Sequence, residues 1–206
     1  AMYQAKLAGK NRYHVFDAAQ DSSIRAHHES LGRIRLALER REFVLHYQPK
    51  VNMRTGEVMG VEALIRWQHP ATGLLAPAAF LPVIEDQALA VDLGEWVIDT
   101  ALTQMALWHV AGLDLAVSVN IGARQVQQSD FVPRLQAILA RHPHVHPSRL
   151  QLEILETSAL ADMAQVSRVI EDCARIGVMF ALDDFGTGYS SLTYLKHLPV
   201  KVLKID

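Results

Sequence analysis

The chain has 206 residues, of which 50% are hydrophobic, so it is long and apolar enough for one domain with a substantial core. Its 20 basic and 22 acidic residues nearly balance, which gives no electrostatic case for binding duplex nucleic acid. No apolar run approaches the ~20 residues of a membrane span. A single cysteine, Cys173, excludes an internal disulfide and fits a cytoplasmic protein. Its apolar neighbours predict that the Cys173 thiol faces the core.

The first clear pattern along the chain is an amphipathic helix from about residue 21 to residue 42. Its apolar residues recur at seven-, three- and four-residue steps and so line one face: Ile24, Leu31, Ile34 and Leu38. This face has two possible partners, the chain's own domain or a second copy of the helix in a signalling coiled coil. Fewer than three heptads are present, so the pattern leaves both open.

Strand-like and helical segments follow in the order typical of an α/β protein. Between Leu81 and Leu113 the sequence predicts two helices, the first ended by Gly94 and the second by Gly112. Apolar runs of strand length predict six strands, near Val44–Val51, Val58–Trp67, Leu115–Ile121, Leu150–Ile154, Val178–Asp183 and Val202–Asp206.

Two adjacent carboxylates, Asp183 and Asp184, stand between an apolar strand and a loop that contains Gly186 and Gly188. The carboxyl end of a strand is where α/β folds carry their chemistry, so the pair is a candidate for holding metal ions. The alternative is structural, an Asx turn that caps the next helix.

Polar side chains in other predicted strands favour the metal site. Glu62, Asn120, Glu153 and Glu156 lie in or directly after strands that are otherwise apolar. A buried ionised group is costly unless it is paired or bound to a cation. Oxygen ligands from four strands therefore indicate a hard cation, Mg²⁺ or Mn²⁺ in preference to zinc.

Six blocks of this sequence resemble, in order, the motifs of the EAL domain, a bacterial phosphodiesterase that hydrolyses cyclic di-GMP. The resemblance runs from about Arg41 to Asp206. It rests on Tyr47-Gln48-Pro49-Lys50, Glu62-Ala63-Leu64-Ile65-Arg66-Trp67, Val119-Asn120, Glu153-Ile154-Leu155-Glu156, the run from Asp183 to Ser191, and Leu203-Lys204-Ile205-Asp206. It implies an α/β fold, an incomplete TIM-like (β/α)8 barrel of EAL type with about six of the eight strands present.

The resemblance also implies a site with two divalent ions, Mg²⁺ or Mn²⁺. It assigns Glu62, Asn120, Glu153 and Asp183 as ligands of one ion, with Asp183 bridging to a second ion that Asp184 also binds. Further implied roles are an attacking water oriented by Lys204, a substrate phosphate bound by Arg66, a guanine contacted by Gln48, and a loop from Asp183 to Ser191 anchored by Glu156.

A second resemblance covers the first residues. Ala1 to Tyr13 is similar to the last helix and turn of a GGDEF domain, the diguanylate cyclase fold. The expected organisation is therefore a GGDEF remnant over residues 1–20, a helical linker over 21–40 and the first two-thirds of an EAL domain over 41–206. We expect the chain to be part of a longer protein that a segment before residue 1 could anchor to a membrane. In the EAL family a general-base glutamate lies beyond the last residue present here.

The function implied by the resemblance is metal-dependent hydrolysis of cyclic di-GMP to linear pGpG in bacterial signalling. The parent protein is expected to be a homodimer through its EAL domain. The alternative is a catalytically inert EAL module that serves as a cyclic di-GMP receptor or a signalling interaction domain. With an open barrel, these 206 residues alone are expected to be inactive.

Overall fold

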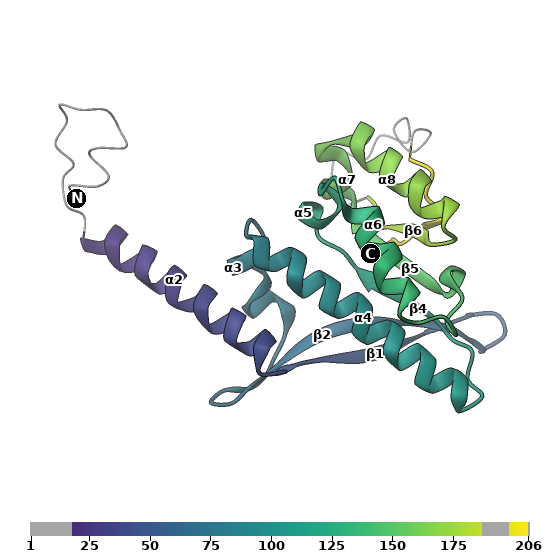
Figure 1. The fold of residues 1–206 in the computed structure, drawn as a ribbon, viewed down its shortest axis with the longest axis horizontal. Coiled ribbons are helices and arrows are strands. Elements are labelled where there is room, and N and C mark those ends of the chain that lie inside the picture. Colours follow the sequence, from purple (N-terminus) through teal and green to yellow (C-terminus); the bar gives the residue numbers. More distant parts are fainter. Residues whose placement is uncertain (1–17, 187–197, 206) are drawn as a thin grey trace.

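One curved sheet organises the computed structural model, which describes residues 18–186 and 198–205 (Figure 1). Its main strands are adjacent in the order β1-β2-β4-β5-β6-β7, and β3 pairs with β2. The strands are β1 (Phe43–Val51), β2 (Val58–His69), β3 (Gly73–Leu75), β4 (Ala116–Asn120), β5 (Leu150–Leu155), β6 (Met179–Asp183) and β7 (Val202–Leu203). All six predicted strands are present, and the α/β class is confirmed.

The direction of the strands departs from a regular (β/α)8 barrel at the start. β2, β4, β5, β6 and β7 run parallel, but β1 is antiparallel to β2. Only six residues separate β1 from β2, too few for the crossover helix that parallel neighbours need. Within the described residues β1 and β7 remain at opposite edges, so the barrel is incomplete.

Helices cover the outer face of the sheet and bury its apolar side chains. The longest is α4 (Ala88–Val110), and α6 (Phe131–Ala140) and α8 (Met163–Arg175) lie beyond it along the sheet (Figure 1). Their apolar residues pack with Val117, Leu152 and Phe180 from the strands in one core cluster. Cys173 of α8 belongs to this cluster, as the sequence predicts. The short helices are α3 (Leu81–Ile84), α5 (Ala123–Val126) and α7 (Glu156–Ala161), with 3-10 turns at Pro77–Ala79 and Pro147–Arg149.

The prediction that Gly94 ends a helix is wrong, because Gly94 lies inside α4. The break falls earlier, between α3 and α4. A Cβ atom at Gly94 would lie 2.1 Å from Oε1 of Gln125, a buried side chain on α5. The glycine is therefore explained by the close approach of α5 to α4, which no local sequence pattern reveals.

The amphipathic helix forms as α2 (Ala18–Glu39), and its second half packs on the chain's own domain. Ile34 and Ala37 are buried in a second core cluster with Phe43, Trp67 and Phe80. Residues 25–30 are exposed, and this part of α2 projects from the domain (Figure 1). Of the two alternatives, packing on the chain's own domain holds for the second half.

Some predictions fall on residues that the structure does not describe. They concern the GGDEF-like segment from Ala1 to Tyr13, the loop after residue 186, and Asp206. Among the described helices, none combines the length and hydropathy that a membrane crossing requires.

Candidate active site

Consecutive residues on the central strands face opposite sides of the sheet. Leu152 and Ile154 of β5 are buried against the helices, whereas Glu153 between them points to the inner side. The parallel register places Asn120 of β4 beside Glu153, and Asp183 ends the next strand, β6. The fold thus gathers acidic and amide side chains on its inner side.

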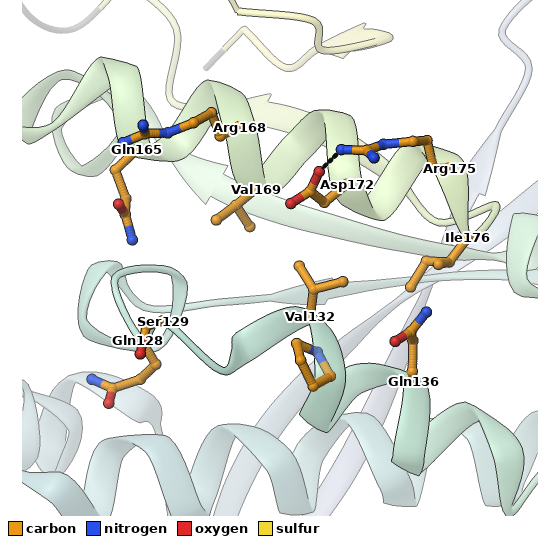
Figure 2. A pocket seen from close by; sticks show the side chains of 11 residues that line it. Gln128, Ser129, Val132, Gln136, Gln165, Arg168, Val169, Asp172, Arg175 and Ile176 are labelled. Atoms are coloured by element: carbon orange, nitrogen blue, oxygen red, sulfur yellow. Dashed lines mark hydrogen bonds and ion pairs between the residues drawn. The ribbon is translucent and has the colours of Figure 1, made fainter.

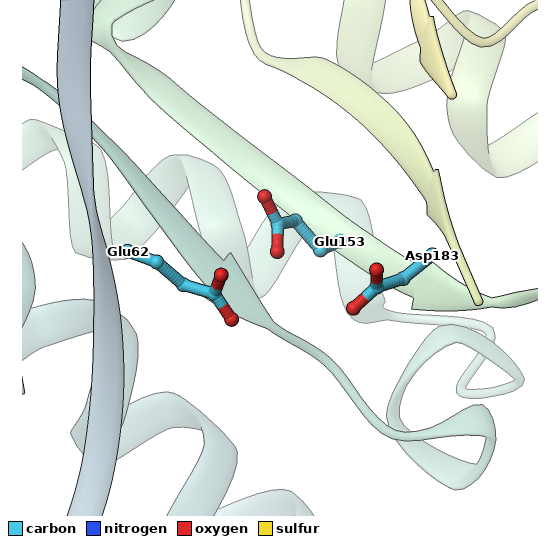
Figure 3. Close-up of side chains that lie close together, drawn as sticks. All are labelled: Glu62, Glu153 and Asp183. Carbon is cyan, nitrogen blue, oxygen red and sulfur yellow. The ribbon is translucent and has the colours of Figure 1, made fainter. Parts of the chain in front are cut away.

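Three carboxylates from three strands meet there: Glu62 of β2, Glu153 of β5 and Asp183 of β6 (Figure 3). One oxygen of each lies within 4.8 Å of the others. The Glu153 side chain is fully buried, and the other two are mostly buried. Such close like charges repel strongly unless a cation lies among them.

Lys204 supplies a cation to this cluster. Its Nζ donates hydrogen bonds to Oε2 of Glu153 at 2.6 Å, Oδ2 of Asp183 at 3.1 Å and Oε2 of Glu62 at 3.1 Å. Burial is the largest single influence and lowers the pKa of Lys204, but the hydrogen bonds to Glu153, Asp183 and Glu62, with the charge of Glu153, outweigh it. The pKa of Lys204 therefore lies above its ordinary value, and the side chain is charged.

A second lysine approaches Glu153 from the other side. Lys50 of β1 donates hydrogen bonds to Oε1 of Glu153 at 3.4 Å, to Oε1 of Gln151 at 3.2 Å and to the hydroxyl of Ser118. Lys50 lies within a motif of the sequence but has no predicted role, and Ser118 and Gln151 are not among the predicted site residues. The available signal was the strand alternation, which places Lys50 on the same face as Gln48.

Two further predicted ligands lie beside the cluster. The side-chain amide of Asn120 donates to Oε1 of Glu62 at 2.8 Å, which leaves its own carbonyl oxygen unused by that bond. Asp184 has φ 55, a left-handed conformation that Asp tolerates better than most residues, and its N–H donates to Oδ1 of Asp183 at 3.1 Å. Asp184 is not part of the three-carboxylate cluster.

The loop after β6 is tied to the start of α7. Oε2 of Glu156, a buried carboxylate, accepts the N–H of Gly186 at 3.0 Å. Gly186 has φ 105, which favours glycine. This contact reaches the first part of the loop that Glu156 is predicted to anchor.

The two predicted substrate contacts lie on the strand pair at the edge. Gln48 of β1 is exposed and directly opposite Glu62 in the antiparallel register. Arg66 lies four residues after Glu62 on the same face of β2, and its guanidinium donates to the carbonyl oxygen of Ile65 at 2.8 Å. Neither side chain belongs to the carboxylate cluster.

A hollow of about 670 Å³ lies elsewhere, between α6 and α8 on the outer side of the sheet (Figure 2). Its lining mixes polar and apolar side chains, and Asp172 and Arg175 on α8 form an ion pair with each other. None of the predicted site residues lines this hollow. The chemistry of the chain is therefore concentrated on the inner side.

Comparisons with curated proteins identify long relatives. The chain is 45% identical over 207 residues to the bifunctional diguanylate cyclase/cyclic di-GMP phosphodiesterase MucR of Pseudomonas aeruginosa, covering 100% of this chain and 30% of MucR. It is 36% identical over 206 residues to the cyclic di-GMP phosphodiesterase PdeR of Escherichia coli, covering 100% of this chain and 31% of PdeR. The chain therefore spans less than a third of these two relatives.

Solved structures agree on the fold. The phosphodiesterase PaMucR in complex with c-di-GMP matches with a TM-score of 0.81 and 47% identity, over 86% of this chain and 72% of that one. The FimX EAL domain of Pseudomonas aeruginosa bound to c-di-GMP matches with a TM-score of 0.77 and 26% identity, over 86% and 71%. The family model described as EAL domain matches residues 31–206, so the chain belongs to the EAL domain family.

Proposed function

We propose that the protein containing this chain hydrolyses cyclic di-GMP to linear pGpG with the help of Mg²⁺ or Mn²⁺. The observation that carries the proposal is the cluster of Glu62, Glu153 and Asp183, three carboxylates from three strands around one ammonium group. A fold gains no stability from gathering three acids in a partly buried site unless cations offset their repulsion. The names of the relatives support the substrate.

The donor set fits a hard divalent cation. Glu62, Glu153 and Asp183 offer carboxylate oxygens within 4.8 Å of one another, and Asn120 holds its amide beside them. We assign these four residues as ligands of one ion and Asp183 with Asp184 as ligands of a second. When bound, such ions supply an activated water and neutralise phosphate charge. Oxygen ligands alone favour Mg²⁺ or Mn²⁺ over softer metals.

The surrounding residues then have separate tasks. Lys204 is charged and lies among the carboxylates, so it can orient a water molecule and offset negative charge on the substrate. Arg66 and Gln48 lie on the same side of the sheet as Glu62, where a guanidinium can bind a phosphate and an amide can bind a guanine. Glu156 fixes the start of the Asp183 loop through Gly186.

The alternative function is that of a receptor, and the hydrolysis experiment described below distinguishes it from the enzyme. An inert EAL module would bind cyclic di-GMP without turnover. The presence of Glu62, Asn120, Glu153, Asp183 and Asp184 favours the enzyme, because inert modules need no set of metal ligands. We also propose that residues 1–20 are the end of a GGDEF domain and that the longer parent protein forms a homodimer through its EAL domain.

The test measures hydrolysis of cyclic di-GMP by the full-length protein with Mg²⁺ or Mn²⁺ and with excess chelator. We expect linear pGpG only when the metal is present, and no turnover by the Glu62→Ala variant at an unchanged melting temperature. Glu171→Ala, at an exposed position of α8, is the matched control and should retain full activity. Full turnover in chelator would exclude the metal-dependent mechanism, and binding without turnover would support the receptor.

A further inference from the structure

Lys50 reaches across the inner side of the sheet instead of projecting from its edge. It starts on β1, yet its ammonium contacts Ser118 on β4 and both Gln151 and Glu153 on β5. The strand order places β2 and β4 between β1 and β5. The side chain therefore crosses β2 to reach its partners.

Gly60 leaves the room for this crossing. It is the residue of β2 directly opposite Lys50, and it has no side chain to meet the lysine stem. Its backbone also fits closely, because a Cβ atom at Gly60 would lie 2.7 Å from the carbonyl oxygen of Ala116. Any larger residue would push β2 away from β4 under the path of Lys50.

The far end of Lys50 is held by a small polar network. The buried hydroxyl of Ser118 accepts a hydrogen bond from Lys50 and donates one to Oε1 of Gln151 at 2.8 Å. Gln151 also accepts from Lys50 at 3.2 Å. Two acceptors on neighbouring strands, Ser118 and Gln151, thus hold the ammonium in position.

Glu153 is held between two cations as a result. Its Oε1 faces Lys50 at 3.4 Å, and its Oε2 faces Lys204 at 2.6 Å within the carboxylate cluster. A carboxylate with one oxygen engaged on each side cannot turn freely about its last bond. Lys50 and Lys204 together therefore fix the orientation of the Glu153 carboxylate relative to Glu62 and Asp183.

We propose that Lys50 is a positioning residue of the metal site, a strut from β1 that holds Glu153 in its ligating orientation through Ser118 and Gln151. The inference rests on the proposed function and adds to it a residue that acts through a ligand. Partners of metal ligands typically contribute 10–100-fold to metal affinity or activity. Lys50 is such a partner, because it binds Glu153, a proposed metal ligand.

The sign of the effect separates positioning from simple charge compensation. Lys50 is positive, so removing it lowers the repulsion that a divalent cation meets at the site. If Lys50 acted by charge alone, Lys50→Met would bind Mn²⁺ more tightly than the native protein. If Lys50 positions Glu153, the same variant binds Mn²⁺ more weakly.

The experiment titrates the metal-free full-length protein with Mn²⁺ and follows free Mn²⁺ by electron paramagnetic resonance. We expect Lys50→Met to weaken Mn²⁺ binding by about 10–100-fold and to lower kcat with little change in KM. Lys50→Arg keeps the charge but replaces a compact ammonium by a planar group, so it should recover only part of the affinity. Lys201→Met, at an exposed lysine, should bind Mn²⁺ like the native protein.

Ser118→Ala provides a second test that does not require Lys50→Met to fold. It removes one support of Lys50 and should weaken Mn²⁺ binding several-fold, yet add little in the Lys50→Met background, because residues that act as a unit are not additive. Unchanged or tighter Mn²⁺ binding by Lys50→Met or by Ser118→Ala would overturn the proposal. Failure of the native protein to bind Mn²⁺ would instead refute the proposed function.

Discussion

The two faces of the central strands carry opposite kinds of side chain at adjacent positions. On β5, Leu152 is packed into the helix-covered core while its neighbour Glu153 joins the acid cluster. On β6 the same contrast holds for Leu182 and Asp183. A single strand thus contributes to stability with one face and to chemistry with the other, through residues that are adjacent in the sequence.

The faces also differ in how their side chains are held. Outer residues are fixed by packing, which is nondirectional and follows buried area. Inner residues are fixed by directed hydrogen bonds from Lys50 and Lys204 to Glu153. Substitutions on the outer face should therefore change the free energy of unfolding alone, whereas those on the inner face should also change metal binding and turnover.

The largest expected effect is on turnover, from Asp183→Asn on the inner face of β6. The substitution keeps the shape of the side chain but removes a charge from the cluster. It should lower kcat by more than about 100-fold, because residues that only hold a metal ligand in place already contribute about 10–100-fold. The melting temperature of the metal-free protein should change by only a few degrees, since one like charge is removed. Steady-state kinetics and calorimetry check both, and a large loss of stability would break the comparison.

Leu182→Ala, one residue earlier, should give the opposite result. Leu182 is fully buried, and such truncations cost about 2–5 kcal/mol of the free energy of unfolding. Below its lowered melting temperature, the folded variant should retain the native kcat and Mn²⁺ affinity. Chemical denaturation measures the stability loss, and a fall in kcat without one would show that the two faces are not independent.

Much of this division is readable from the sequence. Periodicity and apolar runs predict the six strands, and the polar residues inside those runs predict that Glu62, Glu153 and Asp183 come together. The reason is physical, because parallel strands bring their carboxyl ends to one edge of the sheet. A buried acid in an apolar strand is also costly enough to mark a site.

The parts that the sequence does not predict depend on contacts between distant segments. Gly94 looks like a helix end in the local sequence, but a glycine is needed there because Gln125 packs against α4. The reach of Lys50 across β2 follows from its pairing with Gly60, a register that no single strand specifies. The propensity of a segment predicts whether it forms a strand or a helix, whereas these two features depend on the segments packed beside it.

Lys204→Met should destabilise the metal-free protein and have a distinctive effect on metal binding. It removes three hydrogen bonds to carboxylates, and since one hydrogen bond to a charged group contributes about 1.5–3 kcal/mol, the metal-free protein should lose at least that much stability. Mn²⁺ should nevertheless bind more tightly, because the ammonium that competes for the same oxygens is gone. Metal should then raise the melting temperature of the variant more than that of the native protein. Weaker Mn²⁺ binding would mean that Lys204 supports the ligands and does not compete with the metal.

The smallest expected effect concerns Cys173, a titratable group on the outer side. Burial raises the pKa of the Cys173 thiol to about 12, so at pH 8 the folded protein holds only about one thiolate in 10⁴ molecules, against roughly a quarter for a free thiol. Iodoacetamide reacts with the thiolate. We therefore expect no alkylation of Cys173 in the folded protein over a time in which the urea-unfolded chain reacts completely, as mass spectrometry can show. Leu182→Ala should speed the reaction by the factor by which it raises the unfolded population, whereas Asp183→Asn should not speed it. Equal alkylation rates of Cys173 in the two variants would contradict the contrast between the faces. They would show that a substitution on the outer face opens the core no more than one on the inner face.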